Sequence, residues 1–320
     1  MFRNAWLAFV VAAIVAPLPA LAQAQFPSRS VSLIIPAPPG GPTDSAGRVI
    51  ATALAGVLGQ PVVPENRPGA GAIVGTSLLA KATPDGYTVG ALANVGLTSQ
   101  FGLGRDVPYK TDDFIPLGII GFDVVLVSIR TDSHLKSLKE LVDFARANPK
   151  KLSYGAVGIG STSQMAMEAV KQALGIDMTF VPFNGAGPTL TALLGGHIDI
   201  GSAQLSSSLP FVTSGRLKPL IVTSSARTAA LPDVPSVNEL GSSGTPNFWV
   251  GLFLPAKTPP AVVEKLGQAL AQVIKDPAVV TRLERAGLIV DFRPPEAARS
   301  LMLEEIKTIA NLAKNIDLKQ

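Results

Sequence analysis

The chain has 320 residues, of which 47% are hydrophobic and 16% are charged, and its formal net charge is +4. This length supplies more than one small hydrophobic core, so two lobes are expected. The lack of cysteine excludes disulfides, thiolate metal sites, a cysteine nucleophile and a lipid anchor on an N-terminal cysteine. The small positive charge comes without a basic cluster, which argues against a nucleic-acid partner.

The first 24 residues have the pattern of a cleavable export signal. Arg3 precedes an apolar run from Ala5 to Val15, and small residues follow up to Ala24. We therefore expect a secretory signal peptide over residues 1–24, cleaved after Ala22 or Ala24, and an exported mature chain. A membrane anchor is disfavoured because the run is shorter than the ~20 residues that a bilayer requires.

The stretch from Val31 to Gly59 predicts a strand, a loop and a helix. The β-branched run 31–35 is typical of a buried strand, and apolar residues then recur at helical spacing. In the loop between them, Pro42 suits the first helical position, and Thr43 or Asp44 suits the cap. The unpaired N–H groups at such a helix start favour an anion.

The next segments continue as alternating strands and helices. Periodicity predicts strands at 61–63, 87–92 and 114–128, the last long enough to cross between lobes, and helices at 73–80 and 138–147. The Gly69–Gly71 turn suggests a dinucleotide site, but Val74 stands where the third glycine of that motif belongs. The hypothesis of a nicotinamide dinucleotide site is therefore rejected.

Two later segments repeat the opening unit. A strand at 152–156 leads through a glycine loop to a helix capped by Ser161 or Thr162, and a strand at 178–181 leads to a helix at 189–194. Three strand–loop–helix units should thus present backbone N–H donors.

The remaining pattern predicts an α/β fold of two lobes. Expected strands lie at 198–201, 217–223, 248–254 and 289–292, and expected helices at 206–213, 260–274, 277–286 and 295–315. We expect lobe I to be discontinuous, residues 25–123 plus 247–320, and lobe II to comprise residues 124–246. Two crossings without a long linker suggest a hinge.

Catalysis has no supporting constellation in the sequence. His134 and His197 are the only histidines, and neither has a partner at metal-ligand spacing, so both are interpreted as surface or capping residues. There is no GxSxG motif. The competing hypothesis is an exported hydrolase that uses Ser161 or Ser163 near one of these histidines. We predict no enzyme, no metal and no cofactor.

Several ordered motifs resemble one family of receptors. They stand at Pro36–Arg48, Asn66–Gly75, Thr83–Gly90, Tyr154–Ser163, Val181–Thr189, Gly195–Gly201 and Ser214–Leu220. They are similar to the extracytoplasmic receptors of tripartite tricarboxylate transporters, the Bug family. The resemblance implies a two-lobed periplasmic binding-protein fold of type II, with a hinge and an interlobe ligand cleft. It also implies a periplasmic monomer that passes a small carboxylate to the integral membrane permease subunits of a transporter.

The resemblance also implies which loops touch the ligand. These contacts fall on Pro39, Gly40, Gly41, Thr43, Asp44, Gly160, Ser161, Thr162, Ser163, Asn184, Gly185, Ala186 and Gly187. Asn94, Phe183 and Gln204 complete the candidate site, and Phe183 could instead belong to the core. Gln164 and Gln204 lie where this chain departs from the family pattern, so the distal end of the ligand should be bound differently.

The chemistry of the site depends on backbone and hydroxyl donors, because none of the three loops contains Lys or Arg. Two interpretations of Asp44 stay open: it caps its own helix, or it orients a water or accepts a hydrogen bond from the ligand. Arg48 is expected to pair structurally. A sensor that presents its ligand to a membrane signalling protein is a further alternative, and the sequence leaves the identity of the carboxylate open.

Overall fold

The computed structural model describes residues 26–242 and 246–314. The signal peptide expected at residues 1–24 and the expected helix end at residue 315 lie outside the described residues.

The first sheet has six strands in the order β11-β4-β10-β3-β1-β2. These are β1 (Val31–Ile35), β2 (Val62–Asn66), β3 (Thr88–Ala93), β4 (Phe114–Asp123), β10 (Phe248–Pro255) and β11 (Ile289–Arg293). Strand β1 pairs in parallel with β2 and β3, whereas β10 is antiparallel to β3 and β4. The carboxyl ends of β1, β2 and β3 therefore meet at one edge of the sheet.

The second sheet has five strands in the order β7-β6-β8-β5-β9. These are β5 (Val125–Arg130), β6 (Ser153–Ala156), β7 (Thr179–Pro182), β8 (Ile200–Gln204) and β9 (Leu217–Val222). Strand β6 is parallel to β7 and β8, and β5 is antiparallel to β8 and β9. Both sheets thus contain a parallel core, whose strand ends are the usual place for ligand loops.

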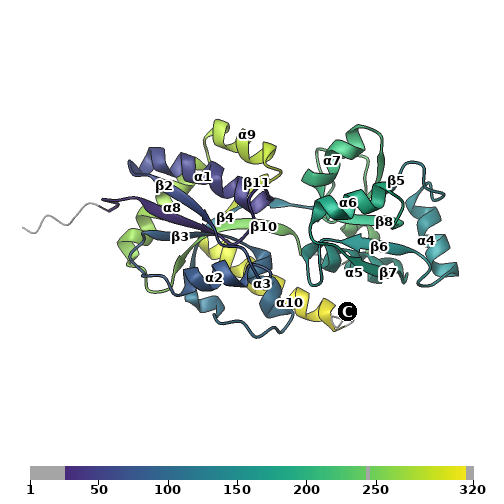
Figure 1. Cartoon of the computed structure of the whole chain (residues 1–320), viewed down its shortest axis with the longest axis horizontal. Helices are drawn as coiled ribbons and strands as arrows, with labels where there is room; N and C mark the ends of the chain where they lie inside the picture. Colours follow the sequence, from purple (N-terminus) through teal and green to yellow (C-terminus); the bar gives the residue numbers. More distant parts are fainter. Residues whose placement is uncertain (1–25, 243–245, 315–320) are drawn as a thin grey trace, which may run out of the picture.

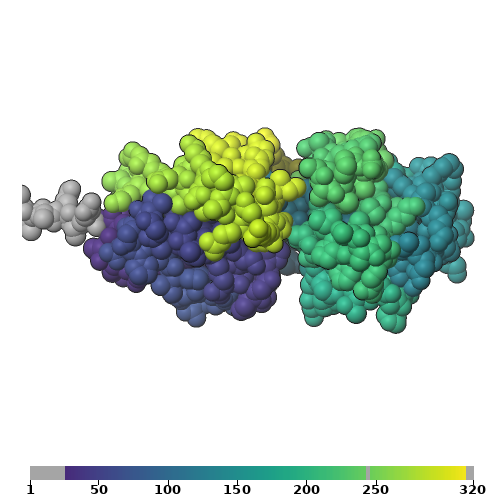
Figure 2. Space-filling view, turned by 90° about the horizontal axis from the view of Figure 1, so that it is seen from above, coloured from purple at the N-terminus to yellow at the C-terminus, as the bar shows by residue number. Residues whose placement is uncertain are grey.

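Helices cover both sheets, and we call each sheet with its helices a lobe. Lobe I carries α1 (Pro42–Leu58), α2 (Ile73–Ala80), α3 (Thr98–Gly102), α8 (Pro260–Val273), α9 (Pro277–Arg285) and α10 (Pro295–Ala313). Lobe II carries α4 (Leu138–Ala147), α5 (Thr162–Leu174), α6 (Ala186–Leu194) and α7 (Leu205–Thr213). The lobes lie side by side along the long axis (Figure 1), and a furrow separates them in the space-filling view (Figure 2).

The start and end of α1 follow from local chemistry. Pro42 occupies its first position, as expected, and Gly59 ends it in the left-handed conformation with φ 68°, where its N–H donates to the Ala55 carbonyl. One face of α1, with Ala46, Ile50 and Leu54, is buried in the main core of lobe I. The helix start is therefore held firmly against the carboxyl end of β1.

Two predicted elements are corrected by the structure. The strand expected at 114–128 is interrupted at Val124, whose carbonyl accepts a hydrogen bond from the Leu205 N–H at 2.8 Å, so β4 and β5 belong to different sheets. Helix α6 begins at Ala186 rather than Thr189, because Gly185 takes φ 118° and places the chain in the helix three residues earlier.

The lobes also share a small apolar contact. Met165 and Ala169 of α5 pack with Ile309 and Leu312 of α10, and Leu103 lies beside them. Since α10 belongs to lobe I and α5 to lobe II, this cluster joins the lobes next to the chain crossings. Among the described helices, none combines the length and the apolar composition that a membrane crossing needs.

Candidate functional site

The loop between β1 and α1 presents free backbone donors. The N-cap of α1 is Gly41, and no side chain caps the helix, so the expected cap by Thr43 or Asp44 is wrong. The Ser45 N–H donates to the Gly41 carbonyl at 2.9 Å. Among the described residues, no acceptor meets the N–H of Gly41, Thr43 or Asp44. Three donors at the start of a 17-residue helix form a suitable place for an anion.

The Asp44 carboxylate is occupied by the protein itself. It is buried and accepts hydrogen bonds from the Gly40 N–H (2.9 Å), the Arg48 Nε (2.9 Å) and the Asn66 Nδ2 (2.8 Å). Burial opposes the charged form, but these three donors together outweigh burial and lower the pKa of Asp44. The geometry favours a structural role for Asp44, although it braces the loop through Gly40, Arg48 and Asn66 instead of capping the helix as expected. It also removes the Gly40 N–H from the free donors and confirms that Arg48 pairs structurally.

The loop before α5 is partly satisfied by hydrogen bonds within the loop itself. Ser161 is the N-cap, and its Oγ accepts from the Gln164 N–H at 3.2 Å. The Ser163 Oγ accepts from the Val157 N–H at 2.9 Å, and the Gly160 N–H donates to the Gln164 Oε1 at 2.6 Å. The N–H groups of Gly158, Ile159, Thr162 and Ser163 have no acceptor among the described residues. Gln164 is 1% exposed, and its Oε1 supports the loop from within.

The loop before α6 is more open. Asn184 and Gly187 are exposed, and no described acceptor meets the N–H of Ala186 or Gly187. Phe183 is half-buried and packs on an apolar cluster of lobe II, in agreement with a core role. Gln204 is the N-cap of α7 at the end of β8, and its carbonyl accepts from the Ser208 Oγ.

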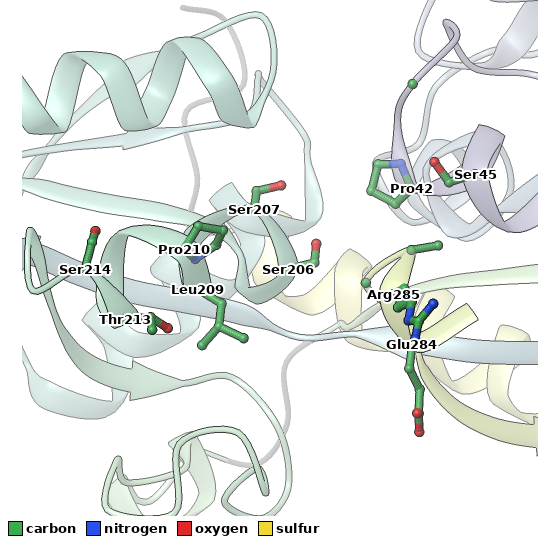
Figure 3. A pocket seen from close by; sticks show the side chains of 13 residues that line it. Pro42, Ser45, Ser206, Ser207, Leu209, Pro210, Thr213, Ser214, Glu284 and Arg285 are labelled. Atoms are coloured by element: carbon green, nitrogen blue, oxygen red, sulfur yellow. The ribbon is translucent and has the colours of Figure 1, made fainter. Parts of the chain in front are cut away.

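A cavity of about 740 Å³ lies between the lobes. Its lobe I wall contains Gly40, Pro42 and Ser45 and the residues 284–287 around the end of α9, whereas its lobe II wall contains residues of α7. Figure 3 shows Pro42 and Ser45 facing Ser206 and Ser207 across this space. The cavity thus brings the predicted β1–α1 loop to α7, but its lining does not include the loops before α5 and α6.

Asn94 joins the two lobes at a different point. Its Nδ2 donates to the Thr162 Oγ1 at 3.1 Å and to the Asn247 carbonyl at 3.0 Å. Glu305 lies next to it and accepts from the Thr98 Oγ1 (2.5 Å) and the Trp249 Nε1 (2.8 Å). Burial raises the pKa of Glu305 to about 7, although these donors counteract the rise. Asn94 and Thr162 are therefore interlobe contacts in this structure.

Asp123 forms a similar buried site at the crossing from β4 to β5. It accepts from the Ser206 Oγ at 2.6 Å, and burial raises its pKa to about 7 against the effect of this bond. Ser206 is the second residue of α7, and a Cβ placed on Gly287 would lie 2.2 Å from the Ser206 Cβ. Lobes I and II therefore meet closely where the chain first crosses.

Two arginines near the site were not predicted. Arg285 lines the interlobe cavity from the end of α9. Arg105 follows α3, and a Cβ placed on Gly160 would lie 3.2 Å from its Nη2. Neither arginine lies in one of the three predicted loops. The sequence gives no local signal that Arg285 borders the site, and the only signal for Arg105 is a weak one, its position directly after Gly104.

The alternatives involving histidine or a metal gain no support from the geometry. His134 and His197 are exposed, as expected, and His134 stacks edge-on against Phe144. Within the described ranges, no group of three or more His, Cys, Asp or Glu side chains is arranged to hold a metal ion.

Comparisons with known proteins agree on one family. A family model described as the tripartite tricarboxylate transporter family receptor matches residues 46–318. The protein BugT of Bordetella pertussis is 32% identical over 302 residues, which cover 92% of this chain and 91% of BugT.

Solved structures with bound ligands are also similar to this chain. MatC (Rpa3494) from Rhodopseudomonas palustris, with bound malate, is 32% identical with a TM-score of 0.77, covering 90% of this chain and 100% of MatC. Rpa4515 of R. palustris, with adipate, is 28% identical with a TM-score of 0.77, covering 90% of this chain and 98% of Rpa4515. These similarities confirm the two-lobed α/β fold predicted from the sequence.

Proposed function

The chain belongs to the receptor family of tripartite tricarboxylate transporters, and we propose that it captures a small organic carboxylate between its lobes and delivers it to the membrane permease of such a transporter. The malate and adipate bound to MatC and Rpa4515 support a carboxylate as the ligand class.

The observation that carries the proposal is the free donor set at the start of α1. The N–H groups of Gly41, Thr43 and Asp44 have no described acceptor, and this helix start borders the interlobe cavity. Hydrogen bonds to a charged group contribute about 1.5–3 kcal/mol each. Three such bonds, set against the cost of association, make micromolar affinity attainable, which corresponds to about −8 kcal/mol.

The second lobe would complete the site by closing. We propose that the lobes hinge near residues 123–125 and 246–247, where the chain crosses between the sheets. Closure would bring the free N–H groups of Thr162, Ser163, Ala186 and Gly187 toward the ligand. Exclusion of water would strengthen each contact, because charges interact more strongly in a medium of low dielectric constant.

We further propose that the mature chain is a periplasmic monomer released after cleavage at Ala22 or Ala24. Mass spectrometry of the exported protein identifies the new N-terminus. Light scattering of the purified protein measures its mass, and a dimer would contradict the monomer.

We also propose that the chain is no enzyme. Ser163 is fully buried and its Oγ accepts from the Val157 N–H, so it is not poised as a nucleophile. In the described part of the chain, neither Ser161 nor Ser163 hydrogen-bonds to a histidine. A serine-directed covalent probe should leave the protein unlabelled, and labelling of Ser161 or Ser163 would support the hydrolase hypothesis.

The proposed function is tested by titration calorimetry of the mature protein with a panel of mono- and dicarboxylates that includes malate and adipate. Binding of at least one carboxylate is expected. If none binds and none raises the melting temperature, the carboxylate receptor is contradicted for this chain.

A further inference from the structure

The interlobe cavity has an uneven distribution of charge. Its lining is apolar or hydroxyl-bearing except for Glu284 and Arg285, which are consecutive residues at the end of α9. Figure 3 shows the Glu284 carboxylate extending away from Pro42 and Ser45, while the Arg285 guanidinium lies nearer to them. The lobe I wall therefore offers an anion both the free N–H groups of α1 and one cationic side chain.

Arg285 is not used by the protein around it. It is exposed, and no described residue forms an ion pair or a side-chain hydrogen bond with it. Several other arginines are paired with carboxylates, for example Arg48 with Asp44 and Arg227 with Glu239. A guanidinium that borders a cavity without a partner can bind a carboxylate through two parallel hydrogen bonds.

The opposite wall supplies a compatible surface. Ser207 of α7 lines the cavity, and no described residue hydrogen-bonds to its hydroxyl, whereas the Ser206 Oγ is already bonded to Asp123. Among the described residues of lobe II, no carboxylate lines the cavity. A second anionic group placed near Arg285 would therefore meet donors on both sides.

We propose that Arg285 binds the second carboxylate of a dicarboxylate whose first carboxylate is held by the α1 N–H groups. This inference rests on the proposed carboxylate-binding function and narrows it to ligands with two acidic groups. Arg285 then determines specificity, since a monocarboxylate of the same length leaves the guanidinium without a partner. The volume of about 740 Å³ falls within the range of small-molecule sites.

The test compares ligands that differ by one carboxylate. Calorimetry of the full mature chain measures succinate against butyrate, malate against 2-hydroxybutyrate, and adipate against hexanoate. The wild type should bind the dicarboxylate of at least one pair about tenfold more tightly or better. This ratio of affinities corresponds to the free energy of one hydrogen bond to a charged group. Arg285→Gln should abolish this preference by weakening the binding of the dicarboxylate, and Arg285→Lys should restore part of it.

The matched control is Arg282→Gln, which removes the same charge one turn earlier on α9, at an exposed residue outside the cavity. It should bind like the wild type. If Arg285→Gln keeps the dicarboxylate preference, or if the wild type has none, the role of Arg285 is overturned while the carboxylate receptor stands. If the wild type binds no carboxylate, both proposals fall together.

Discussion

The side-chain amide of Asn94 donates a hydrogen bond to the Thr162 Oγ1 at 3.1 Å, and this bond joins lobe I to lobe II. The same Nδ2 donates to the Asn247 carbonyl beside the second chain crossing. Asn94 is fully buried, and its Oδ1 has no hydrogen-bond partner among the described residues. The balance between open and closed lobes should therefore respond to changes at this contact.

Thr162→Val should loosen the contact between the lobes. Valine keeps the shape of threonine but removes the acceptor, so the free energy of unfolding in urea should fall by about 0.5–1.5 kcal/mol. Small-angle scattering of the unliganded protein should show a larger radius of gyration. Thr281→Val, on the exposed side of α9, removes a hydroxyl bonded within its own helix and serves as the control. Unchanged scattering of Thr162→Val would show that the bond does not restrain the lobes.

Gly41→Val should severely weaken ligand binding and leave the fold intact. A Cβ at Gly41 would meet only the Pro38 carbonyl, at 3.8 Å, and its extended backbone before Pro42 suits a β-branched residue. The branched side chain would cover the N–H groups of the helix start. We expect calorimetry to show a loss of affinity of about 100-fold, equal to one or two charge-assisted hydrogen bonds.

The control for this change is Gly267→Val in α8, where an added Cβ also meets no atom within 4 Å. Its affinity should equal that of the wild type. Full affinity in Gly41→Val would place the carboxylate away from the α1 start.

Asp44→Asn should lower stability at neutral pH. Asparagine has the same shape but loses the charge that accepts from Gly40, Arg48 and Asn66, and a loss of about 1–3 kcal/mol is expected. The pKa of Asp44 is lower in the folded protein than in the unfolded chain, where it is about 3.9. The stabilisation by its charge is therefore complete above about pH 3.9. It is lost as the pH falls through the folded value.

Urea denaturation at pH 7 and at about pH 3 should therefore show that the difference in the free energy of unfolding between wild type and Asp44→Asn becomes smaller at the lower pH. Asp143→Asn, in the exposed pair with Lys139, should change stability by less than about 0.5 kcal/mol. A difference of constant size at both pH values would mean that the Asp44 charge does not support the loop.

Local signals in the sequence predicted most elements of the fold. The bounds of β1, α2 and α4 agree with the structure, because hydrophobic periodicity and caps such as Ser137 depend only on nearby residues. The β1–α1 loop was also found, since its prolines and glycines mark a turn before a helix. These features need no knowledge of distant segments.

Contacts between distant segments could not be predicted. Asn94 and Glu305 are 211 residues apart, and Trp249 donates to Glu305 across 56 residues. Arg285 belongs to an amphipathic helix that gives no sign of bordering a cavity. The hydrogen bonds inside the loop before α5 also depend on how the Gln164 side chain turns back to the Gly160 N–H, which no spacing rule reveals.

Glu305 should make stability depend on pH near neutrality. It is buried between α10, α3 and β10, and its pKa of about 7 in the folded protein lies above the 4.5 of an exposed glutamate. The folded state therefore binds the proton more tightly than the unfolded chain. The stability that this proton provides is complete below about pH 4.5 and is lost as the pH rises to about 7. Asp123, with the same raised pKa, acts in the same direction.

Glu305→Gln should remove part of this pH dependence, because glutamine resembles the protonated acid but does not titrate. Between pH 5 and pH 8 the free energy of unfolding, measured by urea denaturation, should fall by about 2–3 kcal/mol more for the wild type than for the variant. Glu305→Gln combined with Asp123→Asn should flatten the profile further. Glu304→Gln changes the exposed neighbour on α10 and is the matched control. Its free energy of unfolding should depend on pH as steeply as that of the wild type. Equal slopes for wild type and Glu305→Gln would show that Glu305 is already ionised in the folded protein at pH 5, and that its three donors outweigh its burial.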